Sequence, residues 1–185
     1  MRNNTQKIYE RLCKGTFLAA DSSDLESRHL FEDVEENYED YSLYFKEIGM
    51  SLDAGNGYFC FSRIGEQKQS VAQKLDSFAK WIDYLDFLKC YNNSFCAGYQ
   101  FRKTHLMEEI SVNPELKDKA RHLFKKYGEE SFQSIVDKLL DEMTAIGFAE
   151  CVSEQDGTYK VTSAFNYAEE LVGMIQIANE DEIPQ

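Results

Sequence analysis

The sequence predicts an α+β fold that is mainly helical and consists of two similar units in tandem. One pattern occurs twice, over residues 44–61 and 142–161. In each copy an Ile-Gly pair ends a helical stretch, because glycine adopts the left-handed cap conformation at little steric cost. A short apolar strand, a polar turn ending in glycine and an aromatic-rich strand follow, which is typical of a hairpin. Helices followed by a hairpin outline a winged-helix domain, so we expect tandem winged-helix domains with small β-hairpin wings.

Length and composition agree with this expectation. A chain of 185 residues is long enough for two small domains, each near the lower limit for an adequate core. Apolar residues make up 43% and charged residues 29%, as in soluble globular proteins. Charged residues interrupt every apolar stretch, and no signal-peptide core follows Met1. We therefore expect a cytoplasmic protein.

The first unit begins with a short helix over residues 5–12 and an extended segment over 15–19. Ser22 and Ser23 are expected to cap a long helix, with acidic residues in its first turn. Apolar side chains at spacings of three and four residues predict that this helix continues to the hairpin with one buried stripe. The stripe consists of Leu30, Val34, Tyr38, Tyr41, Phe45 and Ile48.

A second long helix follows the polar segment 65–69, which is the best linker candidate. Its stripe of Val71, Leu75, Phe78, Ile82 and Leu85 is widened by Trp81 and Leu88. A face this broad can contact its own domain along one edge and a neighbour along the other, although a simple core helix explains it as well.

A loop over residues 91–100 completes the connecting segment, and the second unit then begins with a short helix that Thr104 is expected to cap. Pro114 fits the first turn of the next helix. The helix over 132–146 occupies the recognition-helix position, and a Thr162-Ser163 cap is expected to open the last helix. These assignments divide the chain into a first winged-helix domain (1–65), a connecting helix and loop (66–100), a second winged-helix domain (101–178) and an acidic flexible tail (179–185).

Cysteines and histidines give no sign of a metal or redox site. The cysteines at 13, 60, 90, 96 and 151 lack zinc-type or redox spacing, so we expect most of them to be buried, reduced thiols. No Gly-x-x-x-x-Gly-Lys loop, Gly-x-Ser-x-Gly elbow or His-Glu-x-x-His motif occurs. We expect no cofactor, no metal and no enzymatic activity, although a triad assembled from distant positions stays open.

Charge favours a protein partner over DNA. The net charge is −13, and residues 21–53 alone carry eleven carboxylates against two bases. The helix over 132–146 shows Asp137, Lys138, Asp141 and Glu142 on its outer face, whereas a DNA-reading helix offers Arg, Lys, Asn or Gln. One basic patch has two interpretations, a solvated helix face or a phosphate contact. The second interpretation corresponds to the alternative function, a DNA-binding regulator. The patch consists of Lys117, Lys119, Arg121, Lys125 and Lys126.

Several segments resemble the MukE and MksE-like subunits of bacterial condensin complexes, a branch of the tandem winged-helix proteins that bind kleisins. The similarity lies in residues 8–18, 44–49, 57–63 and 157–172, and it spans most of the chain.

This resemblance implies a non-catalytic subunit that forms a homodimer and binds a kleisin-like chain. Through that chain it would act on an SMC-type ATPase that organises chromosomes or acts against plasmids, with DNA contact indirect or weak. Large apolar side chains generally dominate interface energies. Four aromatic residues are therefore candidates for contact with the partner, with core packing as the competing explanation for each: Phe17, Phe59, Phe61 and Phe165.

Overall fold

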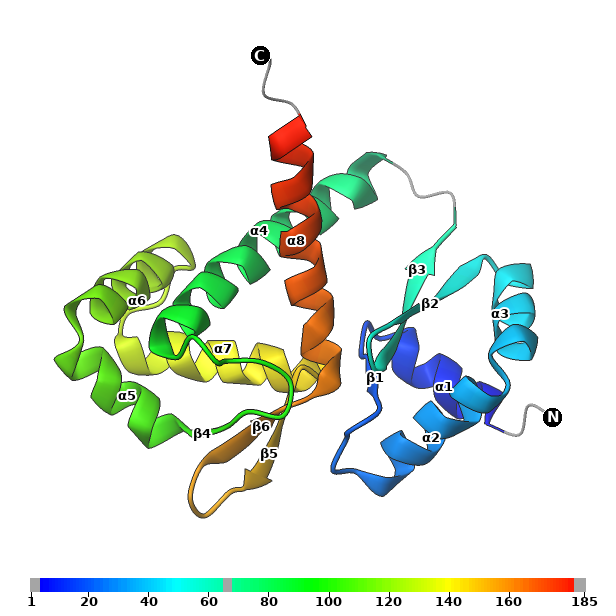
Figure 1. Ribbon diagram of the computed structural model, residues 1–185, viewed down its shortest axis with the longest axis horizontal. Coiled ribbons are helices and arrows are strands. Elements are labelled where there is room, and N and C mark those ends of the chain that lie inside the picture. The colour runs from blue at the N-terminus through cyan, green and yellow to red at the C-terminus, as the bar shows by residue number, and fades with distance from the viewer. Residues whose placement is uncertain (1–3, 65–67, 182–185) are drawn as a thin grey trace.

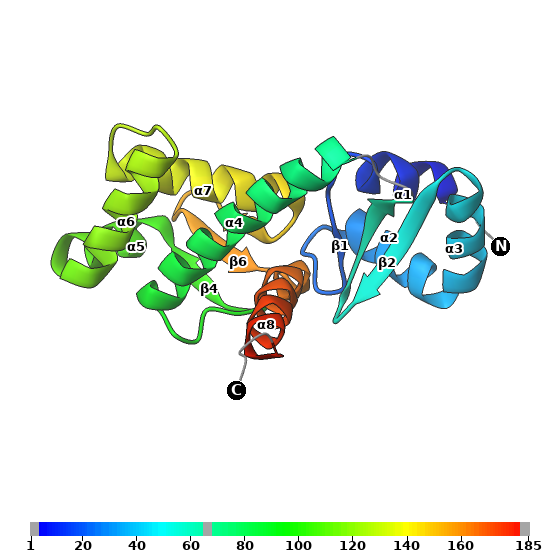
Figure 2. The ribbon, with the colours of Figure 1, turned by 90° about the horizontal axis from the view of Figure 1, so that it is seen from above.

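The structure is a computed structural model that describes residues 4–64 and 68–181, with side chains described for 4–64 and 79–173. It confirms the predicted fold class: the protein is α+β and mainly helical, with two small antiparallel sheets. Figure 1 shows two units side by side, the first in blue to cyan and the second in green to red. The 90° turn in Figure 2 shows the same separation into two units.

Both units follow winged-helix topology. In chain order the first unit reads helix, strand, two helices and two strands, and its sheet has the spatial order β1-β3-β2. The second unit follows the same scheme but has three helices, not two, between its first strand and its hairpin, and its sheet has the equivalent arrangement β4-β6-β5. The first unit consists of α1 (Thr5–Leu12), β1 (Leu18–Ala19), α2 (Leu25–Glu36), α3 (Tyr38–Glu47), β2 (Met50–Gly55) and β3 (Tyr58–Arg63).

The long helix expected before the first hairpin is wrong, because the chain breaks at Asn37 into α2 and α3. Asn37 has φ −124° and ψ 31°, and its side-chain amide donates to the backbone carbonyl of Asp33 at 3.0 Å. Asparagine competes with the helix through such local bonds. Most of the stripe is still buried, but its last member, Ile48, lies at the end of α3 and is 49% exposed.

Ser22 and Ser23 do not cap α2, which corrects a second expectation. The cap is Asp24, whose carboxylate accepts from the backbone N–H of Ser27 at 3.0 Å. Both serines instead donate to Glu150 of the second unit, Ser22 through its hydroxyl and Ser23 through its backbone N–H.

The second unit contains α7 with the predicted bounds, and Asn113 caps α6 with Pro114 in its first turn, as expected. A short strand that the sequence analysis did not predict begins at the last residue of the expected loop, Gln100, and pairs with β6, placing Phe101 opposite Tyr159. The unit consists of α4 (Lys68–Tyr91), β4 (Gln100–Arg102), α5 (Lys103–Val112), α6 (Pro114–Lys126), α7 (Phe132–Ile146), β5 (Ala149–Ser153), β6 (Thr158–Val161), a 3₁₀ turn (Ser163–Phe165) and α8 (Asn166–Asp181).

The two predicted threonine caps in the second unit are also wrong. Arg102 occupies the cap position of α5, without a side-chain bond, so Thr104 lies inside the helix. The hydroxyl of Thr162 donates to the carbonyl of Gly147 at 2.6 Å. This bond connects the end of β6 to the end of α7. Ser163 donates to the carbonyl of Gly57 in the first unit. Tertiary partners have therefore taken both hydroxyls at residues 162 and 163.

Two hydrophobic cores lie under the two sheets, and α4 belongs to the larger one. Tyr84, Phe87 and Leu88 of α4 are buried with residues of α5, α6 and α7. We therefore propose that α4 is the first helix of the second unit rather than a connector. Three parts of the sequence predictions lie outside the described residues. They are linker residues 65–67, the side chains of Val71, Leu75 and Phe78, and tail residues 182–185. Helix α8 runs through Asp181.

The cysteines correct one expectation. None of the five forms a disulfide, but three of them, Cys13, Cys96 and Cys151, are exposed and only Cys60 is buried. No described helix is both long enough and apolar enough to span a membrane. Within the described residues, no His, Cys, Asp and Glu side chains gather as a metal-ligand set.

Candidate partner-binding cleft

The two units meet along the segment that carries β1. The backbone N–H of Phe17 donates to the carbonyl of Ile146 at 2.8 Å. The hydroxyl of Ser163 donates to the carbonyl of Gly57 at 2.6 Å and accepts from the N–H of Ala20 at 3.1 Å. Gly57 has φ +79°, and a Cβ there would lie 2.9 Å from the Cβ of Ser163. Glycine is therefore required for both the turn and the close approach.

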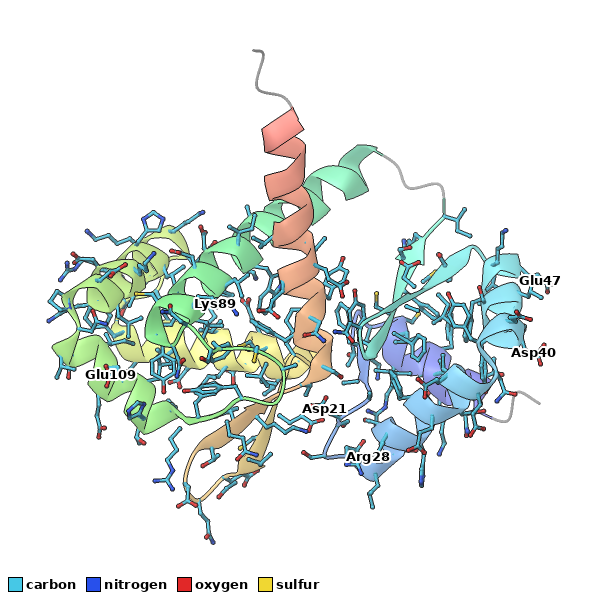
Figure 3. The ribbon with its side chains drawn as sticks, viewed as in Figure 1. Asp21, Arg28, Asp40, Glu47, Lys89 and Glu109 are labelled. Atoms are coloured by element: carbon cyan, nitrogen blue, oxygen red, sulfur yellow. The ribbon has the colours of Figure 1, made fainter. Side chains whose placement is uncertain are left out.

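A charged cluster fixes one end of this junction. The carboxylate of Asp21 accepts from the N–H of Ser163 at 2.7 Å and pairs with Lys160 at 3.1 Å. Burial alone would raise the pKa of Asp21, but these bonds outweigh it and hold the pKa below its ordinary value. Figure 3 shows Asp21 where the first unit faces the second.

The other end is fixed by α8. The hydroxyl of Tyr58 donates to Glu170 at 2.6 Å, and the side chain of Asn166 donates to the carbonyl of Asn56 at 2.7 Å. The hairpin turn of the first unit is thus tied to the first turns of α8. Because both ends are bonded, the two units are held in one register, and any cleft between them is preformed.

An apolar cleft with a cavity of about 330 Å³ opens at this junction. Aromatic rings from both units meet there: Phe17 lies 5.1 Å from Phe148 and 4.9 Å from Tyr167 between ring centroids, and Trp81 lies 4.8 Å from Phe148. Among the residues whose side chains the structure describes, none that lines the cleft is charged. These lining residues are Gly15, Phe17, Cys60, Phe61, Trp81, Ile146, Phe148, Tyr167, Ala168 and Leu171.

The four aromatic candidates from the sequence divide into two groups. Phe17 and Phe61 line the cleft. Phe59 is 6% exposed in the core of the first unit, and Phe165 is fully buried in the larger core. The structure therefore leaves Phe17 and Phe61 for a partner. Sequence reasoning did not select Trp81, Tyr167 or Leu171, although the widened apolar face at Trp81 was a signal for the first of them.

The five basic candidates all lie on α6, but carboxylates neutralise most of them. Lys119 pairs with Asp86 and Lys126 with Asp83, each at 2.5 Å. Arg121 pairs with Asp118 at 2.6 Å. Only Lys117 and Lys125 form no ion pair with any residue that the structure describes. The patch therefore alternates in sign, which weakens attraction to a phosphate chain.

The outer face of α7 is also occupied from within the second unit. Lys103 of α5 pairs with Asp137, and Lys80 of α4 pairs with Glu142 at 2.7 Å. Lys138 pairs with Glu129 at 2.9 Å. The helix at the DNA-reading position thus presents carboxylates bound to neighbouring lysines. The apolar cleft between the two units is therefore a better-defined binding feature than the charged faces of α6 and α7.

Comparison with known proteins agrees with this geometry. The model of a protein family described as condensin complex protein MksE matches residues 3–172. The match spans both units and every residue that lines the cleft. No individual curated protein matches the chain.

Proposed function

Because the chain belongs to the MksE family of condensin complex proteins, we propose that it is a non-catalytic accessory subunit of a bacterial SMC-type complex. In this proposal it binds the kleisin subunit and thereby modulates the SMC ATPase. The complex acts in the cytoplasm on the nucleoid, in chromosome organisation and segregation or in defence against plasmids.

The apolar cleft between the units is the observation that supports kleisin binding most directly. Its walls come from α4, α7 and α8 and from the β1 and β3 region, so a segment seated there contacts both winged-helix units. Large apolar side chains in a desolvated pocket typically provide most of the binding energy of an interface. We propose that the kleisin inserts an apolar side chain between Phe17, Phe61 and Trp81.

Direct DNA recognition is a weaker explanation. The net charge of −13 opposes approach to phosphate. Three of the five basic candidates on α6 are ion-paired. We propose that DNA contact is indirect, through the other subunits. Salt-sensitive DNA binding by the isolated chain, lost when Lys117 and Lys125 are changed to glutamate, would favour the DNA-binding regulator instead.

The test is an affinity measurement with the purified kleisin of the same complex. Leu171→Lys places a charge at the cleft lining, and Leu25→Lys places the same charge at a leucine that is 67% exposed on α2. We expect the first variant to weaken kleisin binding about tenfold or more, since an unpaired charge must be desolvated, and the second to bind normally. Equal binding by both variants, with both folded by circular dichroism, contradicts the cleft as the binding site.

A homodimer is the assembly that we propose for the free chain. Sedimentation equilibrium at several concentrations measures the mass directly. A mass of one chain, 21.5 kDa, at all concentrations contradicts it.

A further inference from the structure

One corner of the first unit exposes several large apolar side chains beside the cleft. Ile64 is 51% exposed, Ile48 49% and Tyr9 39%. The backbone N–H of Ile64 donates to the carbonyl of Gly49 at 3.1 Å, so the two isoleucines lie at the same end of the hairpin. Figure 1 shows β3 and α3 ending together at the upper end of this unit. Single exposed apolar residues are ordinary, whereas several at one place indicate contact with another molecule.

Phe61 connects this corner to the cleft. It lines the cleft, and the centroid of its ring lies 6.3 Å from that of Tyr9. Phe45 packs against both rings, with centroid distances of 4.7 Å to Phe61 and 6.5 Å to Tyr9. The apolar lining of the cleft therefore continues through Phe61 to the exposed ring of Tyr9, and a segment that leaves the cleft on this side meets an apolar surface.

Arg63 places a positive charge at the same corner. It follows Phe61 by two residues on β3, so the two side chains point to the same face of the strand. Cys13 holds the pKa of Tyr9 above its ordinary value of 10.0, and the charge of Arg63 acts in the opposite direction, so both residues lie near the Tyr9 hydroxyl. The exposed apolar surface thus has a guanidinium at its edge.

Lys14 is a second base at the rim of the cleft, since it directly precedes Gly15 of the lining. Lys14 and Arg63 are both exposed, and neither forms an ion pair with any residue that the structure describes. The two bases of α1, in contrast, both pair with carboxylates of the first unit. In a chain whose net charge is −13, the rim of the cleft therefore offers positive charge to carboxylates of another molecule.

We propose that the kleisin segment in the cleft continues past Phe61 onto this corner, with apolar side chains against Tyr9 and Ile64 and a carboxylate paired with Arg63. This inference rests on the function proposed above and adds the chemistry of the segment, which has Asp or Glu next to its apolar residues. Continuity with the cleft and the sign of the two bases select this occupant. A second copy of the chain does not fit, because a two-fold contact across the corner sets the same bases against each other.

The test is isothermal titration calorimetry of the full chain with the purified kleisin of the same complex. Each substitution at the corner has a control of the same kind at an exposed position of the second unit. Arg63→Glu is compared with Arg102→Glu, because Arg102 is exposed on β4 and also forms no ion pair with a described residue. Ile64→Ala is compared with Val112→Ala, since Val112 is 72% exposed at the end of α5.

We expect Arg63→Glu and Ile64→Ala each to weaken kleisin binding about tenfold at low salt, and both controls to bind within about twofold of the unmodified chain. The effect of Arg63→Glu should shrink at high salt, because ions screen exposed charges, whereas the effect of Ile64→Ala should persist. Arg63→Lys keeps the charge and should bind almost normally. A carbodiimide should then link the amine of this variant to an Asp or Glu of the kleisin, which mass spectrometry identifies.

The outcomes separate this inference from the proposed function. Normal binding by Arg63→Glu or Ile64→Ala, while Leu171→Lys loses binding, overturns the inference and leaves the cleft as the kleisin site. Equal losses in Arg63→Glu and Arg102→Glu would show a response to net charge alone and overturn it as well. No binding by the unmodified chain overturns both proposals. If circular dichroism shows that a corner variant is unfolded, the crosslink from Arg63→Lys decides, and its absence counts against the contact.

Discussion

Replacing Asp21 by alanine removes the carboxylate that holds one end of the junction between the two units. That carboxylate accepts from the backbone N–H of Ser163 and pairs with Lys160. A hydrogen bond to a charged group contributes about 1.5–3 kcal/mol. Lys160 keeps its bond to the backbone carbonyl of Asp21, so it is not left without a partner. We therefore expect Asp21→Ala to lower the free energy of unfolding by about 2–3 kcal/mol at pH 7.

The pH dependence of this loss follows from the pKa of Asp21, which lies below its ordinary value of 3.8 in the folded chain. A group with a lowered pKa contributes stability above its unfolded pKa, and that contribution is lost as the pH falls through its folded pKa. The difference between the two proteins should thus be complete at pH 7 and pH 5 and shrink below about pH 4.

Urea unfolding followed by circular dichroism and by the fluorescence of Trp81, which lines the cleft, measures this difference. Asp141→Ala is the control, because Asp141 is exposed on α7; we expect a change within about 0.5 kcal/mol. A loss below about 1 kcal/mol for Asp21→Ala at pH 7, or a loss that persists undiminished at acidic pH, would refute the reasoning.

Three further predictions test single contacts by the same unfolding assay. Gly57→Ala should destabilise the chain more than Gly98→Ala: both glycines have positive φ, but only a Cβ at Gly57 would meet Ser163. Equal losses of stability in the two variants would mean that the close approach between Gly57 and Ser163 is not rigid. Ser131→Ala should cost about 1 kcal/mol because Ser131 caps α7, whereas Thr104→Ala should cost almost nothing. A larger loss at Thr104 would contradict the helix start seen here. Tyr41→Phe should reduce the free energy of unfolding by about 1–2 kcal/mol, since its hydroxyl donates to Asp33 at 2.7 Å. Burial and this bond raise the pKa of Tyr41 to about 12, so its contribution is present below pH 10 and is lost as the pH rises towards 12; a variant difference that grows with pH would argue against it.

The elements that the sequence predicted well are those set by local signals. The predicted bounds of α7 match the structure, in which Ser131 forms a capping box with Ser134 and Gly147, of the Ile-Gly pair that predicted the end of the helix, adopts φ +90°. Such signals act within a few residues, so a single sequence contains them.

Two of the errors occurred where a distant residue decides the local structure, and a third came from a local side-chain bond. Ser22 and Ser23 have the composition of a helix cap, but Glu150 lies close in space and binds both of them. The three residues of β4 became a strand through pairing with β6. Asn37 ended α2 through a local bond, although the apolar periodicity continued across it.

The cleft was predictable only in part for the same reason. Phe17 and Phe61 were among the candidates, but so were Phe59 and Phe165, which are buried. Aromatic residues of the core and of an interface have the same sequence pattern. Which rings face the cleft depends on how the units pack, and the bonds of Asp21, Ser163 and Glu170 determine that packing.

Helices α3 and α7 each come directly before a hairpin and so occupy equivalent positions in the two winged-helix units. Their carboxylates differ in whether they have ion-pair partners. In α7, lysines from α4 and α5 pair with Glu142 and Asp137, two of the three outer carboxylates, so that helix is stabilised by its own unit. In α3, Glu39, Asp40 and Glu47 form no ion pair with any described residue of the chain and surround an exposed leucine. Neither helix presents a basic surface to a DNA duplex. The winged-helix fold is therefore present here without the positive charge that DNA recognition uses. We therefore expect the apolar cleft between the units, rather than the charged face of either helix, to be the main protein contact.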